Sequence, residues 1–160
     1  MSLSCFECGR RSDRLFCDLE PDALREFDQI KEIQTYSKGT VLFREGESAC
    51  GMFLLCQGRV RLSVCSESGR RMTLRTASAG EILGLSAAVS GGCYEVTAEA
   101  IEPVQVAEVH RKELLRFLHE HRDVCLQVVN LLSDDLHLAY DRVRSVGLSR
   151  ARRSHLVPVH

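Results

Sequence analysis

The chain has 160 residues, enough for one domain with a proper core, and its 21 Lys and Arg are balanced by 22 Asp and Glu. This balance gives no global electrostatic case for binding nucleic acid or an anionic membrane. No apolar run approaches the roughly 18 residues that span a bilayer, and no apolar signal segment opens the chain, so we expect a cytoplasmic protein without membrane contact.

Residues 1–18 are polar and lack periodicity, and we expect them to form an N-terminal arm. The arm carries Cys5, Cys8 and Cys17. Cysteines separated by two residues place two thiolates on one tight turn, where they can share a metal or a cluster iron, and a third thiolate supplies another ligand. In a chain without a secretion signal, these cysteines indicate reduced thiols, metal ligands or redox groups rather than disulfides.

A short helix is predicted over residues 21–30, where Pro21 suits the first turn and Leu24, Phe27 and Ile30 recur at helical spacing. A run of short β segments separated by glycines then extends to His110, with Ser68-Gly69 as a hairpin turn and one helical turn in Gly84–Gly92. This pattern is typical of an antiparallel sandwich or roll rather than a parallel α/β sheet. The predicted strands are Thr40–Phe43, Met52–Gln57, Arg59–Cys65, Arg71–Ala77, Tyr94–Ile101 and Val104–His110.

Helix is predicted again from Arg111, with a longer helix from about Arg122 to Val146 that Gly147 ends as a C′ glycine. Apolar side chains on this helix alternate at spacings of four and three, which is the a/d pattern of a coiled-coil seam. The seam consists of Cys125, Val129, Leu132, Leu136, Ala139, Val143 and Val146. A second stripe contains Val124, Val128, Leu131 and Leu138. We expect one stripe to pack on the roll and the other to meet a partner helix in a homodimer; the alternative is that both belong to an intramolecular core.

The segment KGTVLFREGESACGMFLLCQGRVRLS and the later AGEILGLSAAVSGGCYEVTAEAIEPVQVAEVHRKELLRFL resemble the sensor domain of the Crp/Fnr transcription regulators. The similarity covers about residues 15 to 150. It implies a cyclic-nucleotide-binding-like double-stranded β-helix, or jelly roll, followed by a long dimerisation helix. Applied to this chain, it divides the sequence into an arm (1–18), a roll with short helices (19–121), a dimerisation helix (122–147) and a tail (148–160).

Nucleotide-binding members of that family carry a phosphate cassette in which Gly-Glu-x-x-Gly is followed by Arg-Ser, and the Arg pairs with the cyclic phosphate. Gly80, Glu81 and Gly84 are present here, but Tyr94 and Glu95 occupy the Arg-Ser position. A carboxylate at that point repels a phosphate. We therefore expect these five residues to mark an effector pocket that does not take cyclic AMP, unless Arg75 or another arginine substitutes. The plainer interpretation of the two glycines is turn geometry.

The end of the chain departs from the family as well. Family members continue into a winged helix-turn-helix, whereas RARRSHLVPVH offers no recognition helix, so we expect no specific DNA binding by this chain itself. Either the chain is a sensor piece of a longer regulator, or it is a stand-alone partner-binding protein. Arg150, Arg152 and Arg153 are most simply a solvated basic end.

The oxygen-sensing branch of the family holds an iron–sulfur cluster on a comparable N-terminal cysteine group and one cysteine of the roll. In this chain the roll position falls near Ala107, and Cys50 and Cys93 are the possible replacements. Three interpretations stay open for the arm: an iron–sulfur or redox-responsive site, a structural zinc site, and free thiols. Cys56 and Cys65, on predicted strands, and Cys125, in the helix seam, are expected to be buried.

An enzyme is not expected. Cupin enzymes share this type of roll but place two or three histidines inside it, and none of the six histidines here precedes His110. No nucleophile set, P-loop or paired-carboxylate cleft stands out. Together the patterns and the resemblance predict the effector-sensing and dimerisation part of a Crp/Fnr-type regulator that does not respond to cyclic AMP. A redox or gas signal through the N-terminal cysteines is the sharpest version of this hypothesis, and a cyclic-nucleotide-binding module is the alternative.

Overall fold

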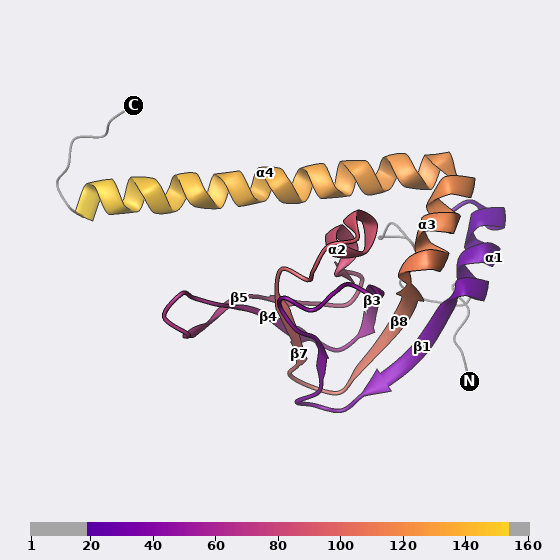
Figure 1. Ribbon diagram of the computed structural model, residues 1–160, viewed down its shortest axis with the longest axis horizontal. Coiled ribbons are helices and arrows are strands. Elements are labelled where there is room, and N and C mark those ends of the chain that lie inside the picture. Colours follow the sequence, from indigo (N-terminus) through magenta and orange to yellow (C-terminus); the bar gives the residue numbers. More distant parts are fainter. Residues whose placement is uncertain (1–18, 154–160) are drawn as a thin grey trace. The chain divides into compact units, whose positions relative to one another are not determined.

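The computed structural model describes residues 19–153 of the chain, and their side chains as far as residue 146. The chain divides into two units between Val124 and Cys125. The first holds the β-roll with three short helices, and the second holds most of one long helix (Figure 1).

Helix α1, Pro21–Ile30, has the predicted bounds. Proline fits its first turn because the N–H that it lacks would have no helical partner there. Ala23, Leu24 and Phe27 form its buried face, and Phe27 packs against Phe117 of helix α3, Arg111–Glu120, with ring centroids 5.9 Å apart. This contact attaches α1 to α3 at one end of the roll.

The roll consists of two four-stranded antiparallel sheets, which confirms the predicted jelly roll (Figure 1). The order in the first sheet is β1-β8-β3-β6, and in the second it is β2-β7-β4-β5. In chain order the strands are β1 (Lys31–Tyr36), β2 (Val41–Phe43), β3 (Gly51–Gln57), β4 (Val60–Cys65), β5 (Arg71–Ala77), β6 (Ile82–Leu83), β7 (Thr97–Ala100) and β8 (Val104–His110). Strands β1 and β6 were not among the predicted segments, and β7 is shorter than the predicted Tyr94–Ile101.

The core lies between the sheets because alternate side chains of each strand point inward. Its centre is an aromatic stack. The ring centroids of Tyr94 and Phe43 lie 4.1 Å apart, and those of Phe43 and Phe53 lie 5.6 Å apart. Aliphatic side chains such as Leu55 and Val60, both fully buried, surround the stack.

The hairpin of β4 and β5 turns at Gly69, whose φ of +84° suits glycine. Strand β5 is an edge strand and is exposed from Arg71 to Thr76, including Met72 and Leu74 at 55% and 44%. Cys65, at the end of β4, is also exposed, so the prediction that it is buried was wrong; it lies where the hairpin extends beyond the core. Cys56, near the end of β3, and Cys125 are only partly buried.

Helix α4 runs from Arg122 to Arg153, so the prediction that Gly147 ends it was wrong. A glycine inside a helix costs only about 1 kcal/mol relative to alanine, and the residues after it, which include Leu148 and three arginines, are good helix formers. None of the helices among residues 19–153 combines the length and the apolar composition of a membrane span.

Candidate functional site

The predicted effector residues Gly80, Glu81 and Gly84 lie in the connection from β5 through β6 to helix α2, Leu85–Ser90. The Gly80 N–H donates to Leu55 O at 2.7 Å, and the Leu55 N–H donates to Glu81 O at 2.9 Å, so this segment is bound to strand β3. The backbone of the cassette is therefore held in one place by the sheet.

Glu81 is the charged centre of this segment. One carboxylate oxygen, Oε1, lies 2.5 Å from the Arg75 guanidinium, and the other accepts the Ser78 N–H at 2.7 Å. The Glu81 side chain is 25% exposed and that of Arg75 is 42% exposed. An arginine is thus present at the cassette, but its charge is already matched by the cassette glutamate.

The Tyr94 side chain points into the core, unlike that of the next residue, Glu95. The ring is 3% exposed and lies against Gly84, where an added Cβ would be 2.7 Å from Tyr94 Cε1. Gly84 also has a φ of +75°, so both the backbone and the ring require a glycine. Tyr94 fills the core beside the cassette, whereas Glu95 is exposed.

The Tyr94 hydroxyl ties the core to the start of β3. It donates to Gly51 O at 2.7 Å and accepts the Cys50 and Gly51 N–H groups, both at 3.3 Å. Burial, followed by the hydrogen bond with the Cys50 side chain, raises the pKa of Tyr94 to about 12. Because the folded-state pKa lies above the ordinary value of 10, the protonated Tyr94 hydroxyl stabilises the fold. This contribution to the free energy of unfolding is complete below pH 10 and is lost as the pH rises through about 12.

We expect a stopped-flow pH jump, monitored by tyrosinate absorbance before unfolding, to show one of the three tyrosines ionising only near pH 12. Tyr94→Phe should remove that late step together with the loss of stability that Tyr94 ionisation causes, which amounts to about 2 kcal/mol between pH 10 and pH 12. A titration curve whose late step survives in Tyr94→Phe would contradict the assignment.

The cysteines of the predicted metal or cluster site, Cys5, Cys8 and Cys17, lie outside the described residues. Ala107, at the family's roll position, is 1% exposed in β8. The proposed replacements Cys50 and Cys93 are both exposed, and their loops are neighbours because Ser48 and Cys93 form a β-bridge. An accessible thiol is therefore present in the roll at two positions from which a fourth ligand could come.

Most of the predicted dimer seam on α4 is accessible in the single chain. Cys125 and Leu132 are half-buried, and Ala139 is exposed. The larger exposed members of the seam are Val129 at 56%, Leu136 at 52%, Val143 at 71% and Val146 at 56%. On the second stripe Val124 and Val128 are buried, whereas Leu138 is 58% exposed.

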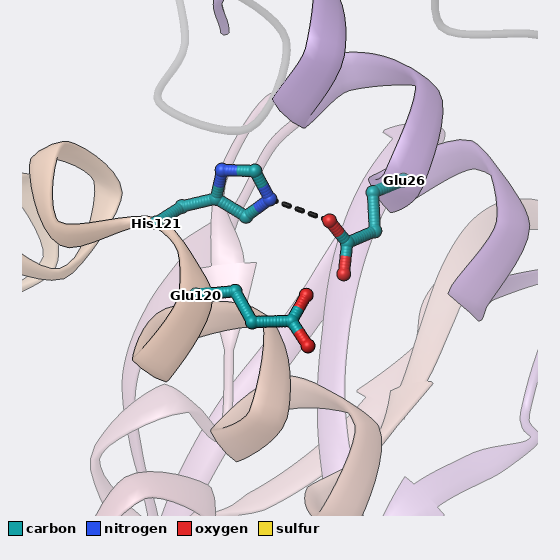
Figure 2. A group of neighbouring side chains, drawn as sticks. All are labelled: Glu26, Glu120 and His121. Carbon is teal, nitrogen blue, oxygen red and sulfur yellow. Dashed lines mark hydrogen bonds and ion pairs between the residues drawn. The ribbon is translucent and has the colours of Figure 1, made fainter.

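A cluster that the sequence did not reveal lies where α1 meets the end of α3. His121 Nε2 is 2.5 Å from Glu26 Oε2, and Glu120 points to the same place (Figure 2). The hydrogen bond with His121 lowers the pKa of Glu26, and hydrogen bonding with Glu26 raises the pKa of Glu120. The only signal in the sequence is the Glu-His pair at a helix end, because Glu26 is 95 residues from His121.

Comparison with known proteins shows the family to which this fold belongs. The model of the cyclic nucleotide-binding domain matches residues 33–121, more than half of the chain. The transcriptional activatory protein AadR of Rhodopseudomonas palustris is 28% identical over 140 residues, which are 88% of this chain but 57% of that protein. This chain therefore spans less than two thirds of that relative's length.

Two solved structures share the fold. The Thermus thermophilus catabolite activator protein superposes with a TM-score of 0.77 at 23% identity, over 86% of this chain and 65% of that one. The sensor domain of the transcriptional regulator DNR from Pseudomonas aeruginosa superposes with a TM-score of 0.69 at 26% identity, over 82% of this chain and 89% of that one. The second match is to a sensor domain on its own.

Proposed function

This chain belongs to the cyclic nucleotide-binding domain family, and we propose that it is the effector-sensing and dimerising part of a Crp/Fnr-type transcription regulator in the bacterial cytoplasm. The names of its relatives, a transcriptional activator and a regulator's sensor domain, support the assignment to transcription. In this proposal DNA is read by a winged helix-turn-helix of the whole regulator rather than by residues 1–160.

The observation that carries the proposal is the exposed apolar stripe of α4. Val129, Leu136 and Val143 are each more than half exposed at heptad spacing, and a monomer rarely leaves such a stripe in water. A second copy of α4 covers it by a/d packing. Sedimentation equilibrium should therefore give the dimer mass at micromolar concentration; a monomer at these concentrations would count against the proposal.

The mechanism follows from the order of the elements. An effector that binds the roll or the arm changes how the roll holds the beginning of α4, and hence the register or splay of the paired helices. Two arrangements of one packed element, biased by a ligand, are sufficient to transmit the signal.

The effector is proposed not to be a cyclic nucleotide. Arg75 is already paired with Glu81 at 2.5 Å, and the position that carries the phosphate-binding arginine in the family has Tyr94, whose ring is in the core. A phosphate would have to displace the Glu81 carboxylate from Arg75 before this arginine could bind it. Calorimetric titration with cyclic AMP and cyclic GMP should show no binding up to about 1 mM nucleotide. This result would mean that the binding free energy is weaker than about 4 kcal/mol.

The alternative of a cyclic-nucleotide module rests on the same arginine, because it is placed at the cassette. Micromolar binding of either nucleotide that Arg75→Gln abolishes would establish the alternative. Binding that survives Arg75→Gln would direct attention to another cation.

A redox or gas signal through the arm is the sharpest form of the proposal. Three cysteines of the arm and an accessible Cys50 or Cys93 provide the thiolate set that an iron–sulfur cluster requires. Protein purified without oxygen should contain iron and matching sulfide, and Cys8→Ser should lose both. Zinc without iron would indicate that the arm holds a structural zinc site. A colourless dimer without metal would contradict the proposal of an iron–sulfur cluster.

A further inference from the structure

Three metal-ligating side chains meet at the contact of α1 with the end of α3, away from the cassette and the cysteines. Glu26 extends from α1, Glu120 is the last residue of α3, and His121 follows it (Figure 2). One donor atom of each lies within 4.8 Å of the other two. We propose that Glu26, Glu120 and His121 bind a first-row divalent transition metal ion of the zinc type, which links α1 to the residue before α4.

The donor set determines the class of metal. One imidazole nitrogen and two carboxylate oxygens suit Zn²⁺ and its first-row neighbours, whereas Ca²⁺ and Mg²⁺ prefer oxygen alone. The imidazole also distinguishes the group from an ordinary patch of surface acids. His121 Nε2 faces the carboxylates, so this nitrogen is the ligand atom (Figure 2).

The distances are compatible with a bound ion after small side-chain movements. Zn²⁺ bonds of 2.0–2.2 Å in tetrahedral geometry place two ligand atoms about 3.4 Å apart. The His121 Nε2 to Glu26 Oε2 separation of 2.5 Å must open, and the wider separations, up to 4.8 Å, must close. Glu26 and His121 are about a quarter exposed and Glu120 is exposed, so their side chains have room to move and water can complete the coordination.

Buried aromatic packing holds the backbone beneath the site. Phe27 and Phe117 are fully buried against each other, one residue and three residues from the nearest ligands. The His121 ring packs on Phe117 with centroids 4.8 Å apart, and the His121 N–H donates to Phe117 O at 3.0 Å. Ligands carried on fixed helices lose little entropy when they bind a metal.

The local charge favours a cation. Among residues 19–146, neither Glu26 nor Glu120 forms an ion pair with a lysine or arginine, and the guanidinium of the neighbouring Arg116 is bonded to Glu113. Two carboxylates therefore face one imidazole, and Arg116 acts on both only through its charge, without an ion pair to either. A divalent ion adds positive charge between the carboxylates and takes the place of the hydrogen bond between His121 and Glu26.

The test is Zn²⁺ titration of the full chain at pH 7.5, with Cys5, Cys8 and Cys17 replaced by Ser so that the arm does not compete. We expect one site, together with a rise in the melting temperature on zinc addition. Loss of a residue that merely orients a ligand already costs 10–100-fold in affinity, so His121→Gln and Glu120→Gln should each weaken binding by at least about a hundredfold and remove the thermal shift.

His119→Gln is the matched control, because it removes an exposed imidazole two residues away on α3 and should leave the affinity unchanged. Glu120 is exposed, so Glu120→Gln keeps the test valid even if His121→Gln folds poorly. Affinity that both variants retain, or a Co²⁺ derivative whose spectrum shows thiolate ligation at that site, overturns the proposal. The site depends on these side chains alone, so its failure would leave the proposed regulatory function unaffected.

Discussion

Replacing Leu132 and Leu136 with Glu will convert the proposed dimer into monomers. Both residues lie on the a/d stripe of α4, and Leu136 is 52% exposed in the single chain. In a symmetric dimer each substitution occurs twice, and loss of one core leucine costs at least about 2 kcal/mol. Even Leu136→Glu alone should therefore weaken dimerisation by about 4 kcal/mol, which is about a thousandfold in the dissociation constant.

Leu138→Glu is the control for this experiment, because Leu138 has a similar exposure of 58% but lies on another face of the same helix. It introduces the same charge with the same helix propensity and should leave the dimer intact. Sedimentation velocity over a concentration series measures both variants. Dimers that persist in Leu136→Glu and dissociate in Leu138→Glu would show that the other face of α4 forms the interface.

Phe117→Ala should have the largest effect on stability. Phe117 is completely buried on α3, where its ring contacts Phe27 of α1 and His121. Truncating a buried phenylalanine removes its burial energy and leaves a cavity, at a cost of about 3–5 kcal/mol. This loss is a large part of the 5–15 kcal/mol that a domain of this kind has in total. Urea unfolding followed by circular dichroism measures it.

Phe117→Leu separates the loss of volume from the loss of the aromatic contacts. It keeps most of the apolar volume and should cost less than half of what Phe117→Ala costs. Equal and small losses for both variants would mean that α1 does not pack on α3 in solution.

The parts of the fold that the sequence predicts are those encoded by neighbouring residues. Pro21 and the spacing of Leu24 and Phe27 are sufficient for α1, and alternation with a Ser68-Gly69 turn is sufficient for the β4–β5 hairpin. Strand β6 was missed because its two residues are too few to show a period. The prediction that α4 ends at Gly147 was wrong because a single glycine is a weak stop signal when helix-forming residues follow it.

The candidate sites likewise contain some features that the sequence predicts and others that depend on packing. Heptad spacing alone marks the apolar stripe of α4, and the cassette glycines can be seen as a motif. The sequence cannot show that the Tyr94 ring occupies the space beside Gly84, or that Arg75 is paired with Glu81, because these contacts depend on how strands pack.

The antiparallel roll, the helix that follows it and the family to which they point could all be predicted from the amino-acid sequence, since they rest on local periodicity and motif spacing. The meeting of Glu26, Glu120 and His121 could not, because it arises only in the folded chain. Glu26 and His121 are 95 residues apart in the chain, and they come together because Phe27 and Phe117 dock α1 on α3. Such a contact depends on how distant segments pack in the core, and a local pattern of residues cannot predict it.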